Sequence, residues 1–154
     1  FITSLSWKGF DLSAIFAYSI GGYIYNRDIT MILHNGSLEG RDWSTEILKR
    51  WTPDNRYTDV PALSTTSNDW NSASTRFLQN NSYMRLKNLT LSYNLPKQWI
   101  SKLSLSSVQV YVQGDNLFTI HRNQGLDPEQ GITGITYYRY PAMRTISGGI
   151  NVSF

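Results

Sequence analysis

Residue types that often carry out chemistry are few and scattered in this chain. The histidines, His34 and His121, accompany no Ser-His-Asp arrangement, no H-E-x-x-H motif and no glycine-rich phosphate loop. The chain has no cysteine, which excludes disulfides and thiolate metal ligands. Asp42 and Glu46 have the spacing of ordinary carboxylates on an exposed helix. The sequence therefore predicts no catalytic residues, no cofactor site and no enzyme.

One segment carries the oxygen ligands that a hard cation prefers. Asp127-Pro128-Glu129, together with Asp115 earlier in the chain, suggests a calcium site. The same tripeptide also has the composition of an Asx-Pro turn, in which solvated acids shape the loop. Because the spacing of an EF-hand loop is missing, the turn is the preferred interpretation and no metal site is predicted.

Aromatic side chains make up 14% of the chain and form the remaining candidates for a binding function. Flat apolar sugar faces stack well on such rings. Five aromatic residues in polar connecting segments are candidate substrate contacts: Trp43, Trp51, Trp70, Tyr137 and Tyr138. The structural alternative is that the tryptophans pack a loop helix and the tyrosines form an interfacial belt. The structural role is favoured, least strongly for Trp70.

Five segments alternate apolar and polar residues with the two-residue period of a β-strand. These segments are Phe1–Trp7, Phe10–Ile24, Ser82–Leu95, Ser104–Phe118 and Thr145–Phe154. A change of phase near Lys87-Asn88 predicts a β-bulge in the third segment. In the last two segments, the polar side is predicted to face a lumen through Gln109, Tyr111, Gln113, Asn151 and Ser153.

Short and long connections alternate between these strands. The long ones run from Asn26 to Asn81 and from His121 to Arg144, a pattern typical of outer-membrane barrels with short periplasmic turns and long outer loops. Inside the first long connection, Asp42–Trp51 is predicted to be a short helix with Asp42 as its N-cap. The segment from Asp54 to Asn81 is predicted to be irregular.

The composition agrees with strands that have one dry face and one wet face. Charged residues are 16%, against about 25% in soluble domains. The longest charge-free stretch, Leu12–Asn26, is too short and too polar for a membrane helix of about 20 apolar residues. The net charge is +3 with basic residues scattered, so the sequence predicts no nucleic-acid partner.

Four motifs together resemble one family, the SusC/RagA-type TonB-dependent transporters. Ser82–Pro96 (SYMRLKNLTLSYNLP) resembles the family stretch SYLRLKNLTLGYTLP, from which Ser92 departs. The other matching motifs are the G-x-N-L-F ending of Val110–Phe118, the G-Y-D-P-E loop at Gly125–Glu129, with Leu126 departing, and the Y-P-x-x-R-T stretch at Tyr140–Thr145.

The resemblance implies an all-β fold, with about five C-terminal antiparallel strands of a large transmembrane β-barrel and one short helix in a long extracellular loop. Residues 1–154 would be the C-terminal part, without the plug and most of the barrel. The implied function is import of oligosaccharides or peptides across the bacterial outer membrane. The implied partners are TonB, through N-terminal regions outside this chain, a SusD-like surface lipoprotein and outer-membrane lipid. Ile150, Val152 and Phe154 resemble the C-terminal strand signal that the barrel-assembly machinery reads.

One alternative of a different class is a free-standing β-sandwich that binds carbohydrate. In a sandwich the apolar strand faces meet one another as a core. The two hypotheses therefore differ in whether Val108, Val110, Ile146 and Ile150 are enclosed by a second layer of the same chain.

Overall fold

The computed structural model describes residues 1–154 except 35–37, 39, 65, 67–71, 102–104, 124, 126 and 130–132. The chain folds into two compact units. The sheet unit comprises Phe1–Gly21, Asn81–Asn123 and Pro141–Phe154. The loop unit comprises Gly22–Asn80 and Gln124–Tyr140, which are the long connections between strands of the sheet unit.

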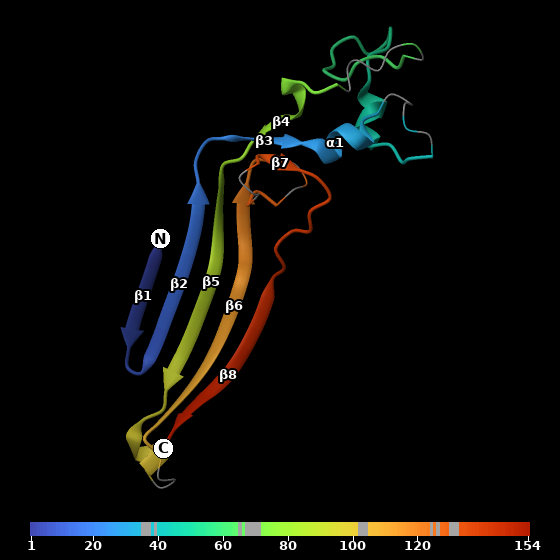
Figure 1. The fold of residues 1–154 in the computed structure, drawn as a ribbon. Coiled ribbons are helices and arrows are strands. Elements are labelled where there is room, and N and C mark those ends of the chain that lie inside the picture. Colours follow the sequence, from blue (N-terminus) through green and yellow to red (C-terminus); the bar gives the residue numbers. More distant parts are fainter. Residues whose placement is uncertain are drawn as a thin grey trace. The chain divides into compact units, whose positions relative to one another are not determined.

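The sheet unit is a five-stranded antiparallel sheet with the order β1-β2-β5-β6-β8 (Figure 1). Its strands are β1 (Ile2–Trp7), β2 (Phe10–Ser19), β5 (Tyr83–Asn94), β6 (Ser107–His121) and β8 (Thr145–Ser153). All five predicted strands are present. The all-β class predicted from the alternating pattern is confirmed.

The predicted second strand ends earlier than its apolar pattern indicated. Strand β2 stops at Ser19, and a separate strand, β3 (Tyr23–Asn26), follows. Gly21 and Gly22 separate them with φ of +83° and +77°, a backbone conformation that side chains with a Cβ rarely adopt. The extension of this strand to Ile24 was therefore wrong, because the periodicity of apolar residues does not reveal where the backbone leaves the extended conformation.

The predicted bulge is confirmed. Along β5, the register with both neighbouring strands shifts between Leu86 and Asn88, so the pairing skips Lys87. The neighbouring strand β6 accommodates the shift at Asn116, whose φ is +51°. Asparagine is among the few residues that tolerate this left-handed conformation.

Short connections join β1 to β2 and β5 to β6 at the end of the sheet away from the long connections. Lys8 and Gly9 connect β1 to β2 with φ of +47° and +88°, the signs that a two-residue hairpin requires. Between β5 and β6, the chain passes Pro96 and forms helix α2 (Lys97–Ile100). Proline cannot donate to a strand ladder, which explains why β5 ends just before it.

The loop unit has its own small sheet with the order β4-β3-β7, in which β3 and β7 run parallel. Strands β4 (Leu78–Asn80) and β7 (Ile135–Thr136) flank β3, and the unit also contains helix α1 (Arg27–Ile32) and the 3₁₀ turn η3 (Thr75–Phe77). Asn26 caps α1 by accepting a hydrogen bond from the Ile29 N–H at 3.0 Å. Ile24 and Phe77 form its buried core. The segment 54–81 is therefore not irregular throughout.

The predicted helix over Asp42–Trp51 is a shorter 3₁₀ helix, η1 (Thr45–Lys49). Its N-cap is Ser44, whose hydroxyl accepts from the Glu46 N–H at 3.2 Å, and not Asp42. At its end, the Asn55 amide donates to the Lys49 carbonyl at 2.9 Å. The Ser44 and Asn55 side chains therefore bond a backbone N–H at the start and a backbone carbonyl at the end of this short helix, which explains why it does not extend. Within the described ranges, no helix has the length and apolar content needed to cross a membrane.

Candidate functional site

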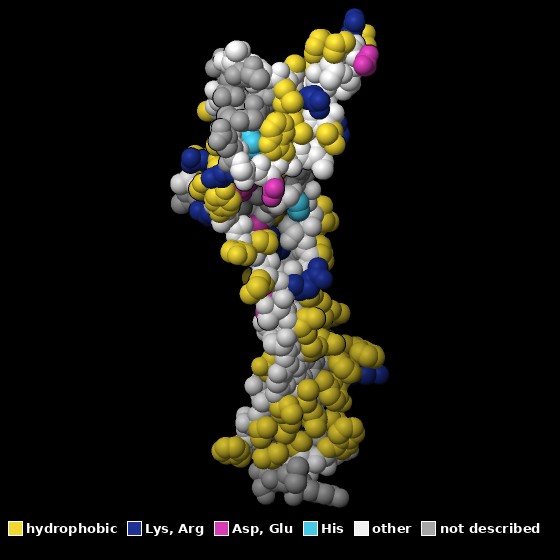
Figure 2. Space-filling view, turned by 90° about the vertical axis from the view of Figure 1, so that its right-hand side faces the viewer, with side chains coloured by type: hydrophobic (Ala, Val, Ile, Leu, Met, Phe, Trp, Pro, Cys, Tyr) yellow, Lys and Arg dark blue, Asp and Glu magenta, His cyan; other side chains and the backbone are white. Residues whose placement is uncertain are grey.

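The two faces of the five-stranded sheet differ sharply in chemistry. On the first, called the apolar face, strand pairing aligns one apolar side chain from each strand in a single row: Trp7, Phe10, Tyr93, Val110 and Ile150. The rings of Phe10 and Tyr93 lie 4.5 Å apart between centroids. Figure 2 shows hydrophobic side chains gathered over the lower part of the molecule. The register therefore builds a continuous apolar surface from all five strands.

This apolar surface is open. Val110 is 43%, Ile146 71% and Ile150 65% exposed. In a sandwich these side chains would be enclosed by a second sheet. The described residues form no second sheet over these side chains, and such a sheet is what the sandwich hypothesis requires.

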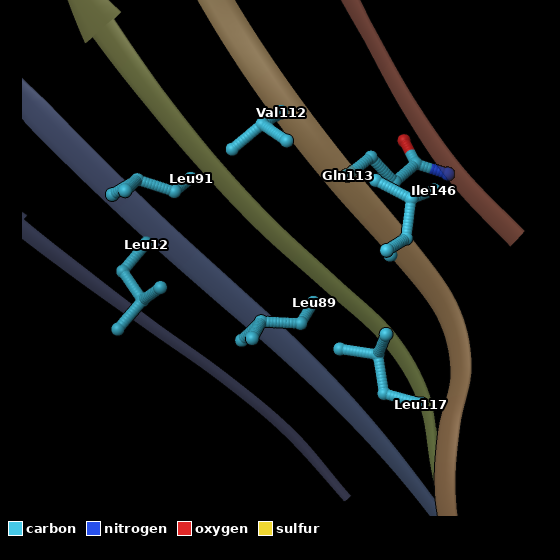
Figure 3. Close-up of a pocket in the computed structure, with 8 residues that line it drawn as sticks. Leu12, Leu89, Leu91, Val112, Gln113, Leu117 and Ile146 are labelled. Carbon is cyan, nitrogen blue, oxygen red and sulfur yellow. The ribbon is translucent and has the colours of Figure 1, made fainter.

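A hollow of about 290 Å³ lies on the apolar face, as Figure 3 shows. Gly114 of β6 is among the residues that line it. A Cβ on Gly114 would lie 2.7 Å from a methyl group of Leu117, which folds over that glycine. The apolar side chains around the hollow are Leu12, Leu89, Leu91, Val112, Leu117 and Ile146.

The opposite side of the sheet, called the polar face, carries hydrogen-bonded side chains across strand boundaries. Asp11 on β2 accepts from the Ser6 hydroxyl at 2.5 Å and from the Asn94 amide at 2.7 Å, which links β1, β2 and β5. Further along the sheet, Gln109 donates to the Ser92 hydroxyl at 3.3 Å and accepts from the Asn151 amide at 3.1 Å, which links β5, β6 and β8.

A second hydrogen-bonded group on the polar face surrounds Asp115. Its carboxylate accepts from the Asn88 amide at 2.7 Å and from the Gln113 amide at 3.2 Å. Thr90 donates to the Asn88 carbonyl oxygen at 2.9 Å and extends the group along β5. Amide donors thus satisfy this carboxylate from two strands, and nothing about the arrangement resembles a cation site.

Tyr111 occupies a special position on the polar face. Its ring lies across Gly149 of β8, where an added Cβ would meet the Tyr111 hydroxyl oxygen at 2.7 Å. The predicted lumen residues of β6 and β8 therefore share one face: Gln109, Tyr111, Gln113, Asn151 and Ser153. That this face lines a lumen stays a prediction.

The candidate calcium ligands do not form one site. Asp115 belongs to the sheet unit, whereas Asp127 and Glu129 belong to the loop unit. The Glu129 N–H donates to the Asp127 carboxylate at 2.9 Å, and Pro128 is buried. This is the Asx turn that the sequence favoured. Among the described residues, no group of three His, Asp or Glu side chains has an arrangement that could hold a metal.

The histidines also have structural surroundings. His34 is buried, and its ring packs edge-on against Trp43 with centroids 5.0 Å apart. His121 lies at the end of β6, where its Nδ1 is 2.9 Å from the Asn123 carbonyl oxygen. The two histidines belong to different units.

Two of the predicted aromatic contacts come together in the loop unit. Tyr137 and Tyr138 pack with ring centroids 4.4 Å apart. The Arg27 guanidinium lies 4.6 Å above the Tyr137 ring, and Arg41 donates to the Tyr138 hydroxyl at 3.3 Å. The Tyr138 N–H donates to the Asp28 carboxylate at 3.0 Å. These five residues are called the tyrosine cluster.

Two hollows of about 460 and 310 Å³ adjoin the tyrosine cluster and share Met31, Ile32 and Tyr138 in their linings. Arg41 and Asp42 line the larger hollow, and Asp28 and Arg139 line the smaller one. Each hollow therefore combines an apolar wall with one guanidinium and one carboxylate.

The tryptophan candidates are not part of this cluster as it is described. Trp43 packs on His34, and the Trp51 N–H donates to the Val60 carbonyl at 2.8 Å. Both side chains keep more than a third of their surface exposed. Trp70 lies outside the described residues. The sequence analysis did not identify Arg27, Arg41 or Asp28, because no motif or periodicity in the neighbouring residues distinguishes them.

Comparison with known proteins identifies relatives along the whole chain, although no protein-family model matches it. The chain is 33% identical over its full length to TonB-dependent receptor P3 of Formosa agariphila and 28% identical over 99% of its length to TonB-dependent receptor SusC of Bacteroides thetaiotaomicron. The chain spans 16% and 14% of these relatives. The structure of the RagAB peptide transporter matches 99% of the chain with a TM-score of 0.85 at 34% identity, over 17% of that structure's chain.

Proposed function

Since the chain belongs to the SusC/RagA-type TonB-dependent transporters of the outer membrane, we propose that residues 1–154 form the C-terminal part of such a transporter's β-barrel. The barrel imports oligosaccharides or peptides. The relatives are receptors and transporters, and this chain contributes to transport and not to catalysis. One observation carries the proposal. A single antiparallel sheet leaves one face apolar and open while the other face is hydrogen-bonded and polar.

The apolar face is the outer wall of the barrel and contacts outer-membrane lipid. Leu5, Trp7 and Phe10 on β1 and β2 are as open as Val110 on β6, so the exposed surface crosses the whole width of the sheet. Exposed apolar area of this extent is costly in water, whereas hydrocarbon chains match it.

The polar face lines the route around the plug. The side-chain amides of Gln109 and Asn151 bond across β5, β6 and β8, and the Gln113 amide donates to Asp115 within β6, so the side chains of this face are held in place by hydrogen bonds. Tyr111 and Ser153 extend the same face. Polar interiors of this kind are typical of barrels that enclose water or a plug.

The last strand carries the assembly signal. Ile150 and Val152 alternate on the apolar face of β8, and Phe154 follows the strand with 95% of its surface exposed. Strand β8 is an edge of the described sheet, with β6 as its partner.

Transport needs partners that lie outside these residues. TonB supplies energy through N-terminal regions of the transporter, and a SusD-like surface lipoprotein covers its outer opening. The candidates for substrate-side contacts in this part are the aromatic residues of the long connections: Trp43, Trp51, Trp70, Tyr137 and Tyr138.

Uptake by cells tests this function. A strain that lacks the full-length gene and carries it back on a plasmid should regain accumulation of a labelled oligosaccharide or peptide mixture. Removal of TonB from the complemented strain should abolish this accumulation while the barrel remains in the outer membrane. Accumulation that persists without TonB, or that does not depend on the gene, would contradict the proposal.

A further inference from the structure

The tyrosine cluster carries an inference about the class of substrate. We propose that the two hollows beside Tyr138 bind peptides that carry carboxylate side chains next to apolar ones. This inference rests on the proposed function, because the long connections of an importer are the parts that meet its substrate first. The residues involved all belong to the loop unit, so the site is built within one compact body.

Positive charge predominates around the two tyrosines. Arg27, Arg41 and Arg139 surround them, against Asp28 and Asp42. Asp28 already accepts the Tyr138 N–H at 3.0 Å, so part of its hydrogen-bonding capacity is used inside the protein. A guanidinium has five N–H donors in a planar fork that matches a carboxylate. The excess of arginine over aspartate on this surface therefore suits an anionic group of a ligand.

Arg41 retains donors for a ligand. Its one described hydrogen bond, to the Tyr138 hydroxyl, is 3.3 Å long and uses a single N–H of Nη1. The guanidinium is exposed at the wall of the larger hollow. Arg139 has the corresponding place in the smaller hollow. Two guanidiniums in two hollows that share Tyr138 suit two carboxylates on one peptide chain.

The shared wall of the two hollows is apolar. Met31 and Ile32 of helix α1 line both of them, and Ile32 keeps 43% of its surface exposed. Methionine adapts its shape to different apolar partners. An aliphatic side chain placed between two carboxylates would cover this wall, and peptides present these groups together.

The cluster suits a sugar ring less well. Stacking of a sugar requires an open aromatic face, and the Tyr137 ring has Arg27 over it at 4.6 Å and the Tyr138 ring beside it at 4.4 Å, so Tyr138, which is 65% exposed, is the more open of the two rings. An aliphatic wall formed by Met31 and Ile32 also offers no hydrogen bonds to hydroxyl groups. A peptide is therefore favoured over an oligosaccharide at this site.

Tyr138 is held in place for this role. Its φ of +47° is a left-handed conformation that bulky residues rarely adopt. Asp28 holds its N–H and Arg41 holds its hydroxyl, so both ends of the residue are anchored. Unusual backbone conformations of this kind concentrate at binding sites, where a ring fixed in advance needs no further ordering.

Binding to the purified full-length transporter tests the proposal. The probe is a fluorescent hexapeptide of alternating Glu and Leu, compared with its Gln-Leu counterpart, a neutral oligosaccharide and a uronic-acid oligosaccharide. The Glu peptide should bind at least about tenfold more tightly than the Gln peptide, because a charged hydrogen-bonded pair adds about this factor. Higher salt should weaken only the Glu peptide.

Paired variants locate the site. Arg41→Gln with Arg139→Gln should weaken the Glu peptide by about 10- to 100-fold and leave the Gln peptide unchanged. The matched control is Arg56→Gln, an exposed arginine of the same unit that donates to the Pro53 carbonyl and lines neither hollow. It should bind like the wild type. Heat-modifiable migration establishes that each variant barrel is folded.

The proposal is overturned if the Glu and Gln peptides bind equally, if no probe binds, or if the double variant behaves like the control. It is also overturned if an oligosaccharide binds and the double variant loses it. Should the double variant fail to fold, the peptide comparison and the salt dependence of the wild type still decide. Because binding to purified protein needs no TonB, a failure of the import function would appear separately in the uptake experiment.

Discussion

Substitution of Val110 by arginine would place a guanidinium in the row of apolar side chains that crosses β5, β6 and β8. Val110 lies between Tyr93 and Ile150 and is 43% exposed on the apolar face. If this face meets hydrocarbon, an arginine costs about 2–4 kcal/mol at the middle of the bilayer and less towards the interfaces, so for Val110, three residues from the start of β6, this range is the upper limit. That cost corresponds to about a 30- to 700-fold shift in the folding equilibrium.

The adjacent residue provides a matched control with the same new side chain. Gln109 lies on the polar face, where it donates to Ser92 and accepts from Asn151. An arginine there can still donate to Ser92 but cannot accept from Asn151, whose exposed amide can bind water. The expected cost of Gln109→Arg is therefore about 0.5–1.5 kcal/mol, the value of one hydrogen bond.

The two substitutions should be compared in the full-length transporter. The measurements are the heat-modifiable folded fraction in outer membranes and the urea midpoint after reconstitution in lipid vesicles. Val110→Arg should reduce both much more than Gln109→Arg. Equal damage from the two, or greater damage at Gln109, would refute the assignment of the apolar face to lipid.

Two further predictions address packing within each unit. Gly149→Val should destabilise the barrel by about 1–3 kcal/mol, because its Cβ would meet the Tyr111 hydroxyl at 2.7 Å. Adding Tyr111→Ala should recover part of this loss in urea unfolding, and strictly additive losses would contradict the contact. Asn26→Ala should destabilise helix α1 by about 1 kcal/mol, because the cap to the Ile29 N–H is lost. Hydrogen exchange in α1 should become faster, while an unchanged rate would show that the cap contributes nothing.

The strands of the sheet unit follow from local sequence. Alternation places Val108, Val110 and Val112 on one side of β6, and pairing in the structure keeps them together. The bulge at Lys87 is visible in the same way, because one extra residue reverses the phase of all that follow. Each of these signals is contained within a few neighbouring residues.

Local pattern was less informative about the ends of elements. Strand β2 ends at Ser19 although apolar residues continue in phase, since Gly21 and Gly22 adopt positive φ angles that a strand does not have. Helix η1 begins at Thr45 because Ser44, and not Asp42, accepts the free N–H group. Near the end of β2 and the start of η1, more than one residue has the type that ends a strand or caps a helix. The folded structure shows which residue has that role.

The two-faced strands and the family could be predicted from the sequence alone. Alternate residues of a strand lie on the same face, and each family motif is a contiguous stretch of residues. Only the tertiary structure decided the tyrosine cluster. Tyr138 meets Asp28 and Arg41 across 110 and 97 residues of chain. No periodicity spans such separations, since side chains so distant become neighbours only after the loop unit has closed around β3 and β7.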